Sequence, residues 1–162
     1  MNPQELKRIL HYDPESGVFV WKVKPSMIVD SGDIAGTICT DGYINILIKR
    51  KRYKAHRLAF LYMTGEFPEY VDHINGIRDD NRWNNLRECN RKQNAQNAKL
   101  RTDNSSGIKG VYWHSRAKKW AAQARMDGKT KIIGYFTDIN EAILARTEFV
   151  NKNYDKRFYR EH

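Results

Sequence analysis

Polar residues near the middle of the chain have the side-chain types that hydrolysis of a phosphodiester needs. Asp72 and His73 are adjacent, Asn85 follows twelve residues after His73, and Asn94 follows nine residues after Asn85. Asp72 offers a hard oxygen ligand, and His73 offers a base with a reference pKa of ~6.5, near neutrality. Asn94 offers a neutral carbonyl oxygen, and one carboxylate with one amide suits a magnesium ion that keeps several waters and accepts phosphate oxygens. The pattern predicts a hydrolytic site with one divalent cation.

The same four residues also have ordinary structural roles. Asp72 is the kind of residue that forms a turn, and a lone histidine such as His73 is more often a satisfied structural group than a base. Asn85 would satisfy backbone groups under either interpretation, and Asn94 on a polar helix would by default be solvated. Only the combined spacing favours the chemical interpretation over these alternatives.

The dipeptide Asp72-His73 also sets a geometric condition. Neighbouring residues on a regular strand point to opposite faces, so both can address one phosphate only if the strand ends or twists there. Asn75-Gly76, directly downstream, supplies the turn chemistry. If both residues lay in mid-strand on opposite faces, the catalytic interpretation would be in difficulty.

The segment 71–94, VDHINGIRDDNRWNNLRECNRKQN, resembles the HNH endonucleases, the ββα-metal family. The resemblance implies that Asp72 and Asn94 are metal ligands and that His73 is the general base. It also implies that Asn85 orients the loop that carries the histidine. Asn94 stands where many members of the family have a histidine, which implies magnesium or manganese rather than zinc.

The charge of the chain indicates a polyanionic partner. Lys and Arg number 29 against 19 Asp and Glu, which leaves a net charge of +10, and no run approaches the roughly 18 apolar residues of a membrane span. Six of the nine residues at 49–57 are basic, and between Arg87 and Lys131 twelve Lys or Arg face three acidic residues, interleaved with aromatic ones. This favours a nucleic acid over a membrane. The predicted contacts around the motif are His56, Arg57, Arg78, Arg91 and Lys92, although His56-Arg57 could instead belong to a helix face paired with acidic neighbours.

The segment 109–146 resembles the AP2 DNA-binding domain through Gly110-Val111, Lys119-Trp120-Ala121, Arg125, Gly134-x-Phe136 and Glu141-Ala142. The resemblance implies three antiparallel strands packed on one helix, with the sheet laid into the major groove. Tyr112, His114 and Ile132 depart from the plant pattern, so the docking mode carries over and the plant target sequence does not. The implied DNA contacts are Lys109, Tyr112, His114, Arg116, Gln123, Arg125, Lys129 and Lys131.

The elements around these motifs predict an α+β chain: a small N-terminal β-rich/α module, a ββα-metal core and a C-terminal three-stranded antiparallel sheet packed on one helix. The expected domains are 1–100, with the motif at 70–98, and 108–162, joined by a linker at 101–107. Asp41-Gly42 predicts a hairpin, a helix is expected from Ala55 to the Thr64-Gly65 stop, and Asp138 should cap the last helix. Two cysteines without a CxxC indicate a reduced, intracellular protein.

The order of the two resemblances is similar to that of phage HNH homing endonucleases. We expect a DNA endonuclease with one Mg²⁺ or Mn²⁺ ion, no small-molecule cofactor and double-stranded DNA as its partner, in the host cytoplasm if it is phage-encoded. With one motif, a monomer would nick. The alternatives are a non-enzymatic, sequence-specific DNA-binding regulator with a degenerate motif, and a nuclease directed at RNA.

Overall fold

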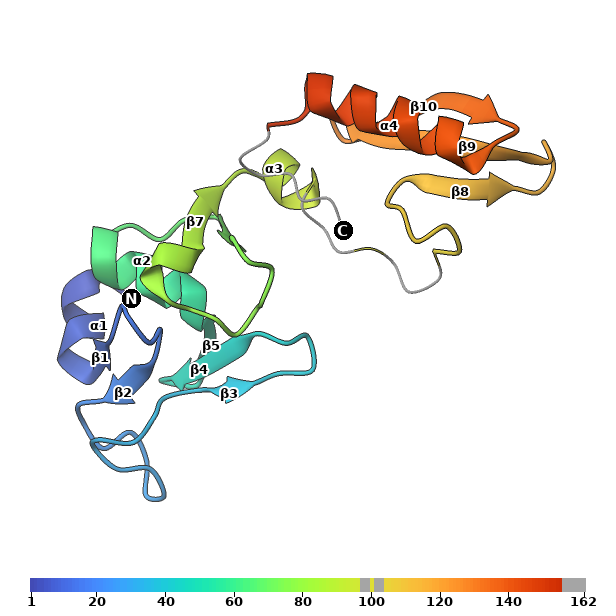
Figure 1. Cartoon of the computed structure of the whole chain (residues 1–162). Helices are drawn as coiled ribbons and strands as arrows, with labels where there is room; N and C mark the ends of the chain where they lie inside the picture. Colours follow the sequence, from blue (N-terminus) through green and yellow to red (C-terminus); the bar gives the residue numbers. More distant parts are fainter. Residues whose placement is uncertain (97–99, 101–103, 156–162) are drawn as a thin grey trace. The chain divides into compact units, whose positions relative to one another are not determined.

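The computed structural model describes residues 1–96, 100 and 104–155, and the chain forms two compact units, Met1–Asn90 and Arg91–His162 (Figure 1). The predicted α+β class is confirmed. Residues 101–103 of the predicted linker and 97–98 of the predicted motif lie outside the described residues, and the predicted domain limits stay predictions. Within the described ranges, no helix is long and apolar enough to cross a membrane.

The first unit opens with helix α1 (Pro3–Ile9), whose N-terminus is capped by Asn2. The Oδ1 of Asn2 accepts a hydrogen bond from the backbone N–H of Glu5, which satisfies one of the donors that a helix start leaves open. The chain then forms a short antiparallel pair, β1 (Leu10–Tyr12) and β2 (Phe19–Trp21). Both strands are short, with three residues each.

A three-stranded sheet follows, in the order β3 (Thr37–Ile38), β4 (Ile44–Ile48) and β5 (Lys51–Lys54). The hairpin predicted at Asp41-Gly42 is confirmed, and the backbone N–H of Cys39 donates to the carbonyl of Tyr43 at 2.8 Å across it. Strand β5 takes up part of the basic run, in which lysine and arginine have a low strand propensity. It forms because antiparallel pairing with the apolar β4 outweighs the low strand propensity of lysine and arginine.

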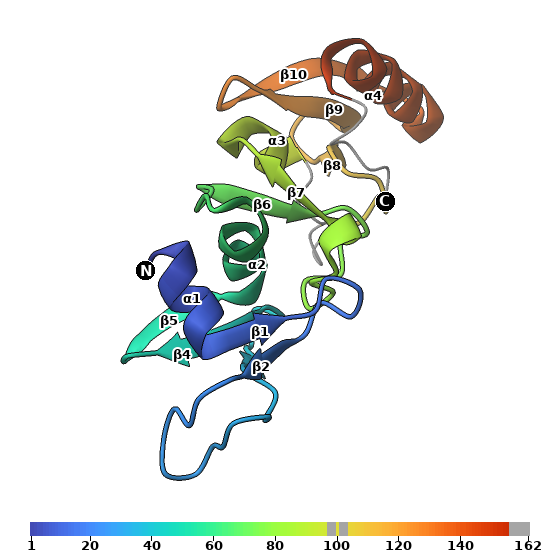
Figure 2. The same cartoon turned by 90° about the vertical axis from the view of Figure 1, so that its left-hand side faces the viewer.

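Helix α2 (Ala55–Thr64) confirms the helix expected after the basic run. It ends at Gly65, whose φ of 82° is a left-handed conformation that glycine adopts without strain. Leu58 and Ala59 are fully buried and join the main core, and α1 and α2 lie side by side (Figures 1 and 2). This helix is the platform on which the next pair of strands packs.

Strands β6 (Tyr70–His73) and β7 (Leu86–Cys89) form a two-stranded antiparallel sheet. Val71 and Leu86 enter the same core as α2. The connection between the strands is a polar loop that ends in the short 3₁₀ helix η1 (Trp83–Asn85). The ring of Trp83 packs against that of Phe60 of α2 in a tilted arrangement, with the ring centroids 4.8 Å apart, so it anchors the loop to the core.

The second unit contains α3 (Arg91–Gln96) and a sheet in the order β10-β9-β8, formed by β8 (Val111–His114), β9 (Lys119–Met126) and β10 (Lys129–Phe136). Helix α4 (Ile139–Asn153) lies along one face of this sheet (Figure 1). As predicted, Asp138 caps the helix, accepting a hydrogen bond from the N–H of Asn140 at 2.6 Å. The expectation of three strands packed on one helix is confirmed.

Candidate active site

Strand β6 positions the predicted Asp72-His73 dipeptide, and His73 is its last residue. The register sets Asp72 opposite Arg87 and His73 opposite Leu86. The two side chains therefore leave the strand on opposite faces. Because the strand ends at His73, they are not in mid-strand, and a phosphate that meets both must lie at this open end.

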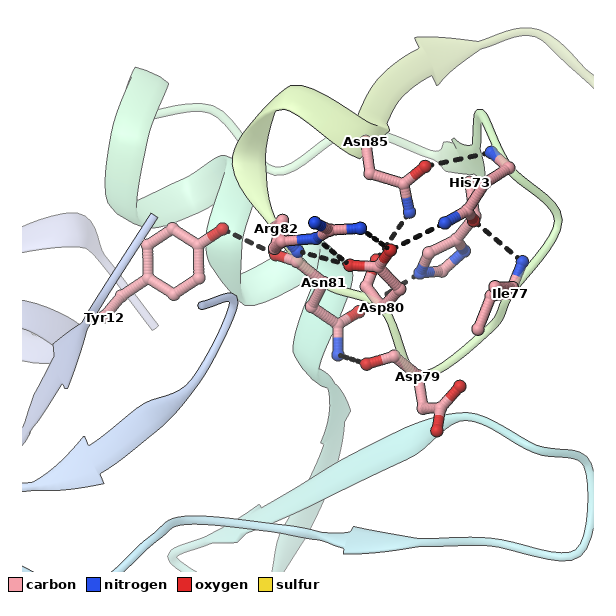
Figure 3. Close-up of polar contacts among 9 residues, drawn as sticks. Tyr12, His73, Ile77, Asp79, Asp80, Asn81, Arg82 and Asn85 are labelled. Carbon is pink, nitrogen blue, oxygen red and sulfur yellow. Dashed lines mark hydrogen bonds and ion pairs between the residues drawn. The ribbon is translucent and has the colours of Figure 1, made fainter. Parts of the chain in front are cut away.

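The ring of His73 is buried, with 3% of the residue exposed. Its Nε2 lies 3.1 Å from Oδ1 of Asn81, and Nδ2 of Asn81 donates to the carbonyl of Asp79 at 3.3 Å (Figure 3). With the amide oriented in this way, Oδ1 can only accept, so Nε2 of His73 carries the proton. In the neutral form of the ring the lone pair is then on Nδ1, the nitrogen that would accept a proton from water.

Asn81 is a site residue that the sequence reasoning missed. It is 1% exposed, and its backbone carbonyl accepts a hydrogen bond from the hydroxyl of Tyr12 at 2.7 Å. Tyr12 lies on β1, 69 residues earlier in the chain, so the N-terminal module supports the loop beside His73. An asparagine in a run of polar loop residues looks solvated in the sequence, and no local signal marks it as buried.

Asn85 holds the loop between β6 and β7 in place. Its Oδ1 accepts the backbone N–H of Asn75 at 2.9 Å, and its Nδ2 donates to the carbonyl of Asp80 at 2.7 Å (Figure 3). Its own carbonyl accepts the N–H of Ile74 at 2.8 Å. Asn85 thus contacts both the start and the end of the loop that follows His73, an arrangement suited to the orienting role that the family resemblance implies.

Asp80 and Arg82 stabilise the far end of this loop. The guanidinium of Arg82 donates to both oxygens of Asp80, at 2.8 and 2.6 Å, and this contact lowers the pKa of Asp80 to about 2. Asn75 donates its Nδ2 to the same carboxylate at 2.6 Å. Asp80 is therefore ionised at neutral pH, and its carboxylate links Asn75 and Arg82 within the loop (Figure 3).

His56, predicted to contact phosphate, is instead enclosed beside His73. It is 6% exposed, and the two imidazole rings meet edge to face at 5.0 Å, with Tyr43 at 5.1 Å from His56. Burial, and then the neighbouring His73, lower the pKa of His56 to about 3. Among the described residues its Nδ1 is buried without a hydrogen-bond partner. His56 is therefore neutral at neutral pH and lies against the ring of His73. Its contact with a phosphate stays a prediction.

Two of the arginines predicted near the motif, Arg57 and Arg78, are held by backbone carbonyls of the first unit. The Nε of Arg57 donates to the carbonyl of Pro68 at 3.0 Å, and the Nη1 of Arg78 donates to the carbonyl of Asp41 at 2.7 Å. Arg78 also lies 5.1 Å from the ring centroid of Tyr43, against which Lys54 stacks at 4.0 Å. These contacts bring Arg78 and Lys54 to the same aromatic ring that borders His73.

Asp72 is paired with Arg87, whose Nε and Nη2 donate to Oδ2 of Asp72 at 2.8 and 2.5 Å. Within the described part of the chain, no three side chains of His, Cys, Asp or Glu gather as a metal site. The donors expected from the sequence are one carboxylate and one amide. Such a set suits a hard cation that keeps several waters and takes phosphate oxygens, not the nitrogen and sulfur set of zinc.

The predicted residues on α3 belong to the second unit. Asn94 and Arg91 are exposed, and Lys92 forms an ion pair with Asp127 at 2.8 Å within that unit. A shared metal site of Asn94 and Asp72 stays a prediction.

The predicted DNA contacts of the C-terminal sheet divide between its two faces. Ala122 and Ala124 of β9 pack on the α4 side. Because side chains alternate along a strand, Gln123 and Arg125 lie on the other face, and Tyr112, which pairs with Ala121, lies there too. Lys129 and Lys131 pair with Met126 and Ala124 and therefore share the α4 side, where Nζ of Lys131 lies 5.2 Å from the ring centroid of Phe149. This differs from the expectation that they face DNA with the sheet. The group on the face away from α4 comprises Tyr112, His114, Gln123 and Arg125.

The last two predicted contacts lie at the ends of β8. Arg116 is exposed in the turn that leads to β9. Lys109 is half-buried, and burial, followed by the charge of Arg146, lowers the pKa of Lys109 to about 8. A lysine so placed is less suited to phosphate than an exposed one.

Comparisons with known proteins agree with the site. A family model described as HNH endonuclease matches residues 53–96. Protein 3.8 of Escherichia phage T7 is 35% identical over 82 residues, which cover 48% of this chain and 68% of that protein. A solved structure titled "DNA binding and cleavage by the HNH homing endonuclease I-HmuI" aligns at 22% identity with a TM-score of 0.44. The alignment covers 60% of this chain and 55% of that one.

Proposed function

The chain belongs to the HNH endonuclease family, and from this premise we propose that it is a metal-dependent DNA endonuclease of the homing type. It hydrolyses one phosphodiester bond, with His73 as the general base and with Asp72 and Asn94 as ligands of one divalent cation. As a monomer with one motif it nicks double-stranded DNA. The C-terminal sheet, AP2-like in its expected docking, binds the duplex.

The observation that carries this proposal is the way the ring of His73 is hydrogen-bonded and enclosed. In the neutral form of the ring, the hydrogen bond to Asn81 leaves the lone pair on Nδ1, and the buried neighbour His56 is neutral, so His56 adds no positive charge beside it at neutral pH. A neutral imidazole with a fixed tautomer is able to take a proton from the attacking water. Asn85 fixes the loop that follows His73 and so limits the movement of the base.

The cation would be magnesium or manganese, held by Asp72 and Asn94. Bound there, it would neutralise the charge that develops on the phosphate and on the leaving oxygen. Arg78 and Lys54 lie on the ring of Tyr43 beside His73 and would attract the phosphate, while Lys54 also forms an ion pair with Asp41.

One observation favours the alternative of a DNA-binding regulator without catalysis. The carboxylate of Asp72 is already neutralised by the guanidinium of Arg87. If that pair were permanent, Asp72 would be a structural residue of the sheet. The regulator would bind DNA through the C-terminal sheet and leave it intact.

Supercoiled plasmid separates the two functions. We expect the wild-type protein to convert plasmid to the open-circular form with Mg²⁺ or Mn²⁺ and not with EDTA. His73→Ala and Asp72→Asn should stop nicking, while His73→Ala keeps the gel-shift affinity of the wild type. Arg52→Gln, which removes an exposed charge on β5, is the control for a general loss of positive charge. Undiminished nicking by His73→Ala would overturn the base, and intact plasmid with bound wild-type protein would favour the regulator.

A further inference from the structure

The ion pair between Asp72 and Arg87 joins facing positions of β6 and β7 and is largely enclosed. The side chains are 11% and 19% exposed, and the guanidinium reaches Oδ2 of Asp72 through both Nε and Nη2. By contrast, Arg82 in the Arg82–Asp80 pair of the neighbouring loop is 50% exposed. An arginine fork on one carboxylate with little water nearby is a strong, directed contact.

The same carboxylate is the proposed ligand of the cation, and this inference therefore rests on the proposed function. A divalent cation on Asp72 would lie beside the guanidinium, and two positive groups on one carboxylate repel each other. The cation must either share Asp72 with Arg87, which costs free energy because the two positive groups repel each other, or displace Arg87. Moving a partly buried guanidinium away from a carboxylate costs free energy, and a new anion beside it lowers that cost.

DNA supplies that anion. A phosphate presents two oxygens at a spacing that an arginine fork matches as well as it matches a carboxylate. A phosphate that reaches the open end of β6 would arrive next to Asp72, within the range of a side chain as long as that of Arg87.

We propose that Arg87 is an exchangeable partner of Asp72: it holds the carboxylate in the DNA-free protein and moves to a DNA phosphate when the cation takes Asp72. The exchange makes cation binding and DNA binding favour each other. In the DNA-free protein Arg87 competes with the cation and keeps its affinity low. The coupling is reciprocal, so the cation raises the affinity for DNA by the same factor by which DNA raises the affinity for the cation.

The test measures binding rather than cleavage. Manganese affinity of the DNA-free full chain is determined by the loss of the free Mn²⁺ signal in electron paramagnetic resonance, for the wild type, Arg87→Gln and Arg87→Lys. We expect Arg87→Gln to bind Mn²⁺ roughly three- to tenfold more tightly, because the competing ion pair is gone. Arg87→Lys, which keeps the charge without the fork, should lie between the two, and it stands in for the glutamine variant if that protein does not fold.

A second measurement follows the coupling. Affinity for a fluorescent duplex is measured by anisotropy with Mn²⁺ and with EDTA, in a His73→Ala background that prevents cleavage. With Arg87 present, Mn²⁺ should tighten DNA binding by about fivefold or more, the lower end of usual coupling factors. With Arg87→Gln the factor should approach one, and with the charge control Arg52→Gln it should stay at the wild-type value.

The outcomes separate the inference from the proposed function. Unchanged or weaker Mn²⁺ binding by folded Arg87→Gln overturns the exchange, even if the wild type nicks plasmid and Asp72→Asn loses Mn²⁺ affinity. Equal Mn²⁺ affinity in the wild type and Asp72→Asn overturns the metal site and the exchange together. Tighter Mn²⁺ binding and lost coupling in Arg87→Gln, with Arg52→Gln unaffected, support the exchange.

Discussion

Nε2 of His73 and Oδ1 of Asn81 lie 3.1 Å apart, and the hydroxyl of Tyr12 holds the backbone carbonyl of the same asparagine at 2.7 Å. The proposed base is therefore supported from an element at the beginning of the chain. A base whose tautomer and ring orientation are fixed before the substrate arrives loses little free energy to reorganisation during the reaction. Under the proposed function, the N-terminal module thus supports the base in addition to its share of the core.

Asn81→Ala should damage catalysis more than binding. Without Oδ1 the ring of His73 is free to adopt the other tautomer, so we expect kcat for plasmid nicking to fall by roughly 10²-fold, the lower end of what a general base contributes. KM and DNA affinity should stay near the wild-type values, because Asn81 is buried beneath the loop. The exposed Asn84, three residues on, gives the matched control Asn84→Ala. An equal loss in both variants would contradict the positioning role.

Asn85→Ala should loosen the loop between β6 and β7. The change leaves the N–H of Asn75 and the carbonyl of Asp80 without their side-chain partner, and each unsatisfied group costs about 1–3 kcal/mol when it is buried. Because Asn75 is exposed to water, we expect a loss near the lower end, about 2 kcal/mol in total, by urea unfolding. Hydrogen exchange of the Ile74 and Asn75 amides should also accelerate. A stability equal to that of Asn84→Ala would mean that the loop does not depend on this side chain.

Elements whose causes are local could be predicted from the sequence. The Asp41-Gly42 turn, the stop of α2 at Gly65 and the Asp138 cap each depend on residues within one turn of the chain. The order Asp72, His73, Asn85 likewise carried enough of a family pattern to select the strand end and its loop.

Features that depend on distant partners could not be predicted. Strand β5 exists because β4 pairs with it, and Asn81 is buried because Tyr12 covers it from β1. His56 lies in a basic run that looks solvated, yet the fold encloses it between Tyr43 and His73. The face on which Lys131 lies depends on the register of β10 against β9, which a single strand does not encode.

The buried His56 should make stability depend on pH. Its folded pKa of about 3 lies below the unfolded value, so its contribution is complete above about pH 6.5 and is lost as the pH falls toward 3. The shift arises from burial first and from His73, Lys54 and Arg57 next, while Asp41 opposes it. Between about pH 7 and pH 5 the unfolding free energy should fall by up to about 2 kcal/mol on this account.

His56→Phe keeps an aromatic ring in the site and removes the titrating group. The pH dependence of its unfolding free energy, measured with urea between about pH 5 and pH 7, should be flatter than that of the wild type by this amount. The exposed His11 provides the control His11→Gln, which should follow the wild-type curve. Parallel curves for the wild type and His56→Phe would contradict a neutral, buried His56.

The two faces of the C-terminal sheet should contribute differently to DNA affinity. Arg125 lies on the face away from α4, where a guanidinium is able to bind a guanine edge through two bonds, worth about 1–3 kcal/mol. Lys131 shares the face of Ala124 and stacks on Phe149. By anisotropy with a fluorescent duplex, Arg125→Ala should therefore weaken binding by roughly 5- to 150-fold, and Lys131→Ala by much less.

Salt dependence refines this comparison because phosphate contacts and base contacts respond differently to salt. Loss of one phosphate contact lowers the slope of log Kd against log salt by about one, whereas loss of a base contact changes the affinity at every salt concentration and leaves the slope nearly unchanged. Arg125→Ala should leave the slope nearly unchanged if it reads a base. A greater loss from Lys131→Ala than from Arg125→Ala would assign DNA binding to the α4 side and would remove the AP2-like docking from the proposed function.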